Sequence, residues 1–176
     1  MKSTALLVID VQQGLLDEHP FEADALLQNI KTLQDFARQN GTEVIFVRHH
    51  EDDPNGLFFG SPQWQIGAAI APLEGETIIE KHYSSTFKDT ELEAHLQKQN
   101  IQTLIVCGMQ TEYCVDATVK SAFEHGYKVY IPKYGTTTFD ASIAPADKLR
   151  RYYEEDIWDG RFADVIPLDE ALKELK

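Results

Sequence analysis

The chain has few cysteines: only Cys107 and Cys114 occur among its 176 residues. Their spacing matches neither a zinc motif nor a disulfide framework. Cys107 lies in the apolar run 103–107 and is expected to be a small buried side chain. A buried thiol is a poor resolving partner, so the pair does not favour a redox switch. Cys114 follows polar residues and is the candidate reactive thiol.

Basic residues are also scarce. The chain has 16 lysines and arginines against 29 acidic residues, for a net charge of −13. Nucleic acids and anionic membranes require a basic surface, which excludes them as expected partners. No apolar run has the length of a membrane span, and the start of the sequence does not resemble a secretory signal. We therefore expect a single cytoplasmic domain over residues 1–176.

Short apolar strands alternate with helical segments along the chain. The pattern predicts a parallel sheet with helices on both faces. Strands are expected at 5–9, 43–47, 77–79, 102–107, 127–131 and 163–166. Helices are expected at 23–39, 65–69 (short), 89–99, 113–125, 145–156 and from 168 onward. In such folds, ligands bind beyond the carboxyl ends of the strands, where the strand order reverses.

Three reactive side chains follow three of these strands. Asp10 follows the first strand, Lys81 follows the third, and Cys114 lies in the first turn of the helix after the fourth. The free N–H groups and the dipole at a helix start favour a thiolate. Asp10 could accept the thiol proton, Lys81 could lower the thiol pKa, and backbone N–H groups from Gln110 to Cys114 could hold an oxyanion. The alternative is a structural Asp–Lys ion pair beside an inert cysteine.

Three motifs carry a resemblance to a known family. They are Leu-Val-Ile-Asp-Val-Gln at 7–12, Glu-Lys-His-Tyr-Ser-Ser-Thr-Phe at 80–87 and Gly-Met-Gln-Thr-Glu-Tyr-Cys-Val-Asp-Ala-Thr at 108–118. Together they resemble the cysteine hydrolases of the isochorismatase-like superfamily, which include nicotinamidases and carbamoylsarcosine amidase. The resemblance spans nearly the whole chain.

The resemblance implies a three-layer α/β/α fold with a six-stranded, mainly parallel sheet. It implies a catalytic triad of Asp10, Lys81 and Cys114, with the backbone N–H groups of Gln110 and Cys114 as the oxyanion hole. It also implies a cis peptide bond between Met109 and Gln110. True isochorismatases lack the nucleophilic cysteine, so Cys114 indicates hydrolysis of a C–N bond through a thioester.

The segment after the second strand departs from the nicotinamidases. Those relatives bind a divalent metal through an Asp-x-His motif, and here Arg48 stands where the aspartate would be. His49 and His50 remain possible ligands, with Glu51 or Asp52 nearby. Adjacent residues on an extended segment point to opposite sides, however. We therefore predict no metal and no cofactor, and a nicotinamidase with a metal-assisted site is the alternative.

The predicted function is hydrolysis of an amide, lactam or carbamoyl bond in a small molecule. Expected pocket residues are Gln12, Phe87, Tyr113 and Phe139, which lie in or near the motifs. His82 and His125 are expected to be structural or surface residues. A homodimer or larger homo-oligomer is expected by resemblance. The alternative from another class is a non-catalytic member that uses the fold for binding or assembly.

Overall fold

The fold is built on one parallel sheet, described for residues 3–176 in a computed structural model. Six strands lie side by side in the order β3-β2-β1-β4-β5-β7, and the short β6 pairs with β4. All recorded pairings between these strands are parallel. The strands are β1 (Ser3–Ile9), β2 (Glu43–His49), β3 (Thr77–Lys81), β4 (Ile101–Met109), β5 (Lys128–Pro132), β6 (Thr136–Thr137) and β7 (Asp164–Ile166).

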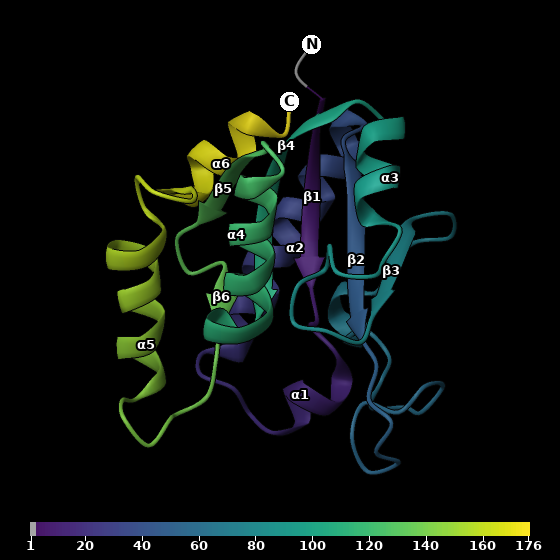
Figure 1. Cartoon of the computed structure of the whole chain (residues 1–176), viewed down its shortest axis with the longest axis vertical. Helices are drawn as coiled ribbons and strands as arrows, with labels where there is room; N and C mark the ends of the chain where they lie inside the picture. Colours follow the sequence, from purple (N-terminus) through teal and green to yellow (C-terminus); the bar gives the residue numbers. More distant parts are fainter. Residues whose placement is uncertain (1–2) are drawn as a thin grey trace.

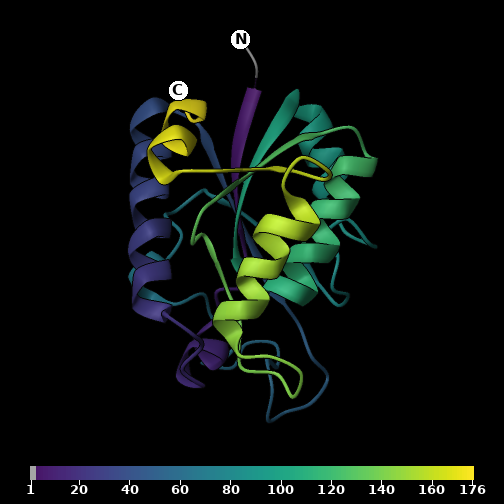
Figure 2. The same ribbon diagram turned by 90° about the vertical axis from the view of Figure 1, so that its left-hand side faces the viewer.

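Helices cover both faces of the sheet (Figures 1 and 2). Helices α2 and α6 pack on one face, and α3 and α4 pack on the other. The helices are α1 (Gln13–Asp17), α2 (Ala23–Asn40), α3 (Leu92–Lys98), α4 (Asp116–Glu124), α5 (Ala146–Tyr152) and α6 (Leu168–Glu174). A short 3₁₀ turn, η1 (Ala68–Ile70), and two π-helical turns, η2 (Thr111–Val115) and η3 (Tyr153–Trp158), complete the elements. None of the helices in residues 3–176 is long and apolar enough to cross a membrane.

The predicted three-layer α/β/α architecture is confirmed. Apolar spacing places the buried side chains of α2 on one stripe, and left-handed Gly41 ends that helix. The sequence pattern did not predict α1 or the two-residue β6. It also predicted one continuous helix over 113–125, whereas the structure has the π-helical turn η2 before α4. The extent of the single domain over residues 1–176 stays a prediction.

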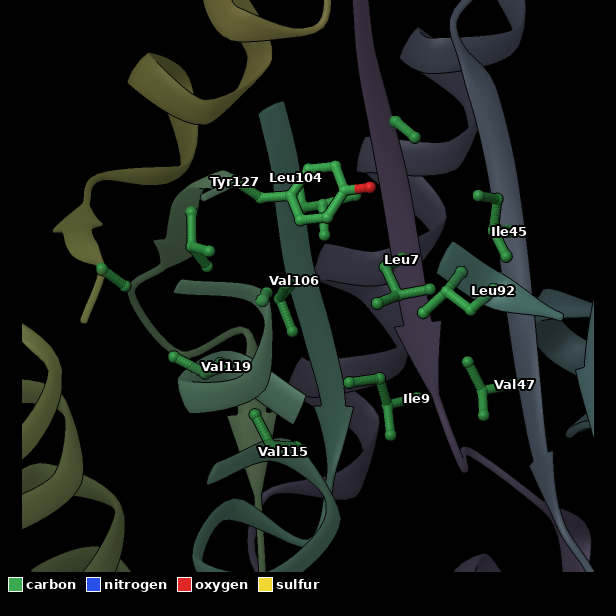
Figure 3. Packing of buried hydrophobic residues seen from close by; sticks show 14 of the residues in the cluster. Leu7, Ile9, Ile45, Val47, Leu92, Leu104, Val106, Val115, Val119 and Tyr127 are labelled. Atoms are coloured by element: carbon green, nitrogen blue, oxygen red, sulfur yellow. The ribbon is translucent and has the colours of Figure 1, made fainter. Parts of the chain in front are cut away.

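Packing under α4 fixes the segment that carries the cysteine. Val115 and Val119 are fully buried against the sheet beside Val106 and Ile9 (Figure 3). Burial of a valine side chain stabilises the fold by roughly 1.5–3 kcal/mol. The start of α4 is therefore held firmly against β4 and β1.

The strand order reverses between β1 and β4, which are neighbours at the centre of the sheet. Figure 1 shows the carboxyl ends of the central strands at the end of the molecule opposite the two termini, beside α1 and the segment after β2. Chains leaving β1 and β4 turn to opposite faces there, which opens a crevice in folds of this kind.

Candidate active site

The buried Lys81 ammonium lies at the centre of the site. Lys81 is the last residue of β3, and its side chain is 0% exposed. Its Nζ lies 2.6 Å from Asp10 Oδ2 and 3.2 Å from Cys114 Sγ. The structure therefore brings together the three residues that the sequence predicted as catalytic.

Asp10 turns sharply out of β1. Its backbone has a φ of 50°, a left-handed conformation that aspartate tolerates better than most residues. The backbone N–H donates to the Val47 carbonyl oxygen at 3.2 Å. Both carboxylate oxygens are buried and, within residues 3–176, neither has a well-directed hydrogen bond. The Lys81 ammonium supplies the compensating charge, and the carboxylate keeps the capacity to accept a proton.

The turn that carries Cys114 depends on Gly108 at the end of β4. Gly108 has a φ of 129°, and a Cβ there would lie 2.1 Å from the Ile9 carbonyl oxygen. Only glycine allows β1 and β4 to approach this closely. The chain then passes through a cis peptide bond between Met109 and Gln110, as the resemblance implied.

The π-helical turn η2 follows, with Gln110 as its N-cap. The N–H groups of Tyr113 and Val115 both donate to the Gln110 carbonyl oxygen at 3.2 Å. Cys114 lies between these two residues and is half-buried. The expected oxyanion-hole residues, Gln110 and Cys114, thus lie on one closed turn.

The protonation state of Cys114 differs from the expectation. Burial, with a further contribution from the Asp10 charge, raises the pKa of the Cys114 thiol to about 12, and Lys81 opposes this rise. The prediction of a thiolate favoured by a helix start is therefore wrong for the resting site. A raised thiol pKa means that the thiol keeps its proton until a base removes it, and Asp10 is the adjacent base.

His49, which the sequence analysis considered only as a possible metal ligand, is a site residue that contacts Lys81. Its Nδ1 lies 3.2 Å from Lys81 Nζ. Burial, together with the Lys81 charge, lowers the pKa of His49. The ring is held in place through its backbone: the Gln12 side chain donates to the His49 carbonyl oxygen at 2.9 Å and accepts from the His49 N–H at 2.8 Å. His49 pairs in register with Lys81 across β2 and β3, a contact that the sequence alone did not show.

The donors of this site do not fit a metal ion. Among residues 3–176, one group of three potential metal ligands was found: Asp10, His49 and Cys114, whose donor atoms lie within 4.8 Å of one another. The Lys81 ammonium contacts all three groups. A buried cation in the middle of the donor set repels a metal ion from the same place.

Arg48 and His50, the neighbours of His49, lie elsewhere. Arg48 forms an ion pair with Glu80 at 2.7 Å and stacks over the Trp64 ring at 3.6 Å. The His50 ring lies 4.7 Å from the His82 ring, measured between centroids, so the two adjacent histidines have different surroundings. This agrees with the alternation expected of an extended segment.

A cavity of about 130 Å³ opens over the cysteine. Its lining residues in the described chain are Asp10, Leu15, His49, Glu51, Leu57, Met109, Gln110, Tyr113 and Cys114. Four larger hollows among the described residues do not include the cysteine, and one of them adjoins this cavity because it shares Leu15, Glu51 and Leu57 with it. The cavity over Cys114 is the one that the reactive groups share.

Only Tyr113 of the four expected pocket residues lines this cavity. Gln12 is fully buried and holds the backbone of the segment after β2, including Trp64 through a bond of 2.9 Å. Phe87 packs against the core and stacks on His125 at 4.9 Å between ring centroids. Phe139 packs against the core on the α2 side of the sheet. Both rings are partly buried against the core, so aromatic residues in or near the motifs were a poor guide to the pocket.

Comparison with known proteins gives consistent matches over most of the chain. The family model described as "Isochorismatase domain" matches residues 4–166. An uncharacterized isochorismatase family protein, YddQ of Bacillus subtilis (strain 168), is 36% identical over 154 residues, which cover 82% of this chain and 86% of that protein. Nicotinamidase 3 of Arabidopsis thaliana is 29% identical over 162 residues, which cover 82% of this chain and 78% of that protein.

The chain is also similar in structure to a solved member of this family. A crystal structure described as an isochorismatase family protein has a TM-score of 0.88 and 33% identity, covering 94% of this chain and 99% of that one.

Proposed function

The chain is an isochorismatase-family hydrolase, and from this premise we propose that it cleaves a C–N bond in a small amide, lactam or carbamoyl compound through a thioester on Cys114. The observation that carries the proposal is the position of the Lys81 ammonium, in contact with both Asp10 and Cys114 beneath one cavity. A nucleophile, a base and a fixed positive charge meet there.

The first half of the reaction forms the thioester. Asp10 removes the Cys114 proton as the sulfur attacks the carbonyl carbon of the substrate, and the carbonyl π electrons move to its oxygen. The backbone N–H groups of Gln110 and Cys114 hold this oxyanion. The intermediate collapses, the C–N bond breaks, and protonated Asp10 gives its proton to the leaving nitrogen.

The second half releases the acid. Asp10, ionised again, removes a proton from a water molecule as the water oxygen attacks the thioester carbon. The C–S bond breaks, and the proton on Asp10 returns to the sulfur. Lys81 stays charged throughout, so it stabilises the carboxylate form of Asp10 between the proton transfers.

The charges around the cavity favour a neutral or cationic substrate. Two carboxylates, Asp10 and Glu51, belong to the lining residues in the described chain, and no lysine or arginine does. Glu51 is held on the wall because its Oε2 accepts the Leu57 N–H at 3.0 Å. A substrate carboxylate would face these acids without a free cation.

Ammonia release over a panel of primary amides, lactams and carbamoyl compounds tests the proposal. Wild-type protein and Cys114→Ala are compared, each with and without a chelator. The proposal expects turnover by the wild type that resists chelation and is lost in the variant. Nicotinamide belongs in the panel because a relative is named a nicotinamidase. Turnover that chelation abolishes would support the metal-assisted alternative.

The non-catalytic alternative makes a different prediction. If the protein only binds or assembles through this fold, no member of the panel is hydrolysed and Cys114→Ala behaves like the wild type. The homo-oligomeric state and the cytoplasmic location stay predictions.

A further inference from the structure

An ammonium group has three N–H donors, and Lys81 Nζ has three polar neighbours: an ion-pair partner, Asp10, and two hydrogen-bond partners. These are Asp10 Oδ2 at 2.6 Å, Cys114 Sγ at 3.2 Å and His49 Nδ1 at 3.2 Å. The Lys81 side chain is 0% exposed, so water cannot replace a lost partner. A buried charge needs every donor satisfied.

We infer that His49 is a positioning residue for the proposed reaction: its Nδ1 accepts the third N–H of Lys81 and so holds the ammonium against both the thiol and the carboxylate. The inference rests on the proposed function of Cys114, which it extends from a triad to a group of four. His49 acts through Lys81, and it fixes where the positive charge lies.

The role requires a neutral imidazole with its proton on Nε2. Nδ1 can accept a hydrogen bond only when it carries no proton. Five charged or titratable groups face the ring from other positions: Lys81 on β3, Asp10 after β1, Glu51 on the next segment, His82 after β3 and Cys114 on η2. The closest is the Lys81 ammonium, and two cations at 3.2 Å would repel each other strongly.

The backbone of His49 is locked independently of its ring. The Gln12 amide pairs with both the N–H and the carbonyl of His49, and Gln12 is itself fully buried. A change of the His49 side chain therefore leaves the path of the chain in place. Substitutions there can test the acceptor alone.

The test compares His49→Asn with His49→Gln. The amide of asparagine falls near the position of Nδ1, whereas the amide of glutamine falls near Nε2. Both variants are polar, and only asparagine keeps an acceptor facing Lys81. The readout is the rate of Cys114 alkylation by iodoacetamide between pH 6 and 9, which needs no substrate. Cys107 is fully buried, so it does not contribute to this rate.

We expect His49→Asn to alkylate at nearly the wild-type rate. His49→Gln is expected to react roughly tenfold more slowly at each pH, because loss of a hydrogen bond to a charged group displaces the cation that lowers the thiol pKa. The matched control is His50→Leu, the adjacent histidine, which should leave the rate unchanged. Thermal unfolding checks that each variant is folded.

Two results would overturn the inference. One is that Cys114 in folded His49→Gln is alkylated at the wild-type rate. The other is that the alkylation rate falls equally in His49→Asn and His49→Gln. Should His49→Gln fail to fold, a slow rate in folded His49→Asn still contradicts the inference, and a rate near wild type supports it. Alkylation needs no turnover. If no compound of the amide panel is hydrolysed, that failure counts against the proposed function, whereas the alkylation rates still decide the role of His49.

Discussion

Lys81 Nζ lies 2.6 Å from Asp10 Oδ2, and neither side chain is more than 1% exposed. A fully buried ion pair contributes little net stability, because removing two charges from water offsets most of their attraction. Its consequence here is chemical. It places a fixed carboxylate and a fixed ammonium beside the sulfur of Cys114.

Breaking this pair from one side is expected to destabilise the fold. Lys81→Met leaves the Asp10 charge buried and unpaired, which costs about 3–5 kcal/mol. The double variant Asp10→Asn with Lys81→Met removes both charges and should be more stable than Lys81→Met alone. Urea unfolding of the four proteins measures the coupling. If the losses of unfolding free energy in the two single variants add up to the loss in the double variant, the two charges do not interact.

Asp10→Asn is expected to separate turnover from thiol reactivity. Loss of the general base should lower kcat by about 10²–10⁴-fold. Alkylation of Cys114 should become faster at a given pH, because the Asp10 charge helps to raise the thiol pKa and Lys81 lowers it.

The matched control for that substitution is Asp169→Asn, which removes one negative charge from an exposed position on α6. This variant should change neither kcat nor the rate of Cys114 alkylation. Slower alkylation in folded Asp10→Asn would contradict the assignment of Asp10 as the group that holds the thiol protonated.

His49 should make stability depend on pH below neutrality. Its pKa in the folded protein is lowered from the ordinary 6.5, so the unfolded chain takes up the proton first as the pH falls. The stabilising contribution is complete above about pH 6.5 and is lost as the pH falls toward the folded-state pKa. Urea midpoints at pH 7.5 and 5.5 should differ more for the wild type than for His49→Asn. An equal difference in both proteins would argue against a neutral, buried His49.

Glu51 should set the charge preference for substrates. Among amides of matched size, an anionic compound is expected to have the lowest kcat/KM. Glu51→Gln keeps the acceptor for the Leu57 N–H and removes the charge, so it should raise kcat/KM for the anionic amide by roughly threefold to tenfold and leave the neutral one little changed. Glu18→Gln, at the exposed residue that follows α1, is the control. An unchanged preference in Glu51→Gln would mean that this carboxylate does not face the substrate.

The catalytic residues were predictable because their positions follow from strand ends. Asp10, Lys81 and the segment leading to Cys114 each come at the carboxyl end of a parallel strand, and those ends meet at one edge of the sheet. Apolar alternation was enough to predict the layers. It was not enough for β6, which is two residues long and packs off the main sheet order.

Other features depended on three-dimensional contacts. Two adjacent histidines stand at the end of β2, and only the register with β3 shows that His49 faces Lys81. The thiol pKa could not be judged from a helix start, because burial and the Asp10 charge outweigh the Lys81 charge. Phe87 is the last residue of the motif at 80–87, yet its ring stacks on the exposed His125 and does not line the cavity. Distance along the chain did not predict distance in space.

Mass spectrometry after rapid acid quenching tests the central claim most directly. During turnover of the best amide from the panel, the peptide containing Cys114 should gain the mass of the acyl group. Cys114→Ala should show no adduct and lose at least about a thousandfold in kcat. Full turnover by Cys114→Ala, without an adduct on any residue of the wild type, would contradict the account.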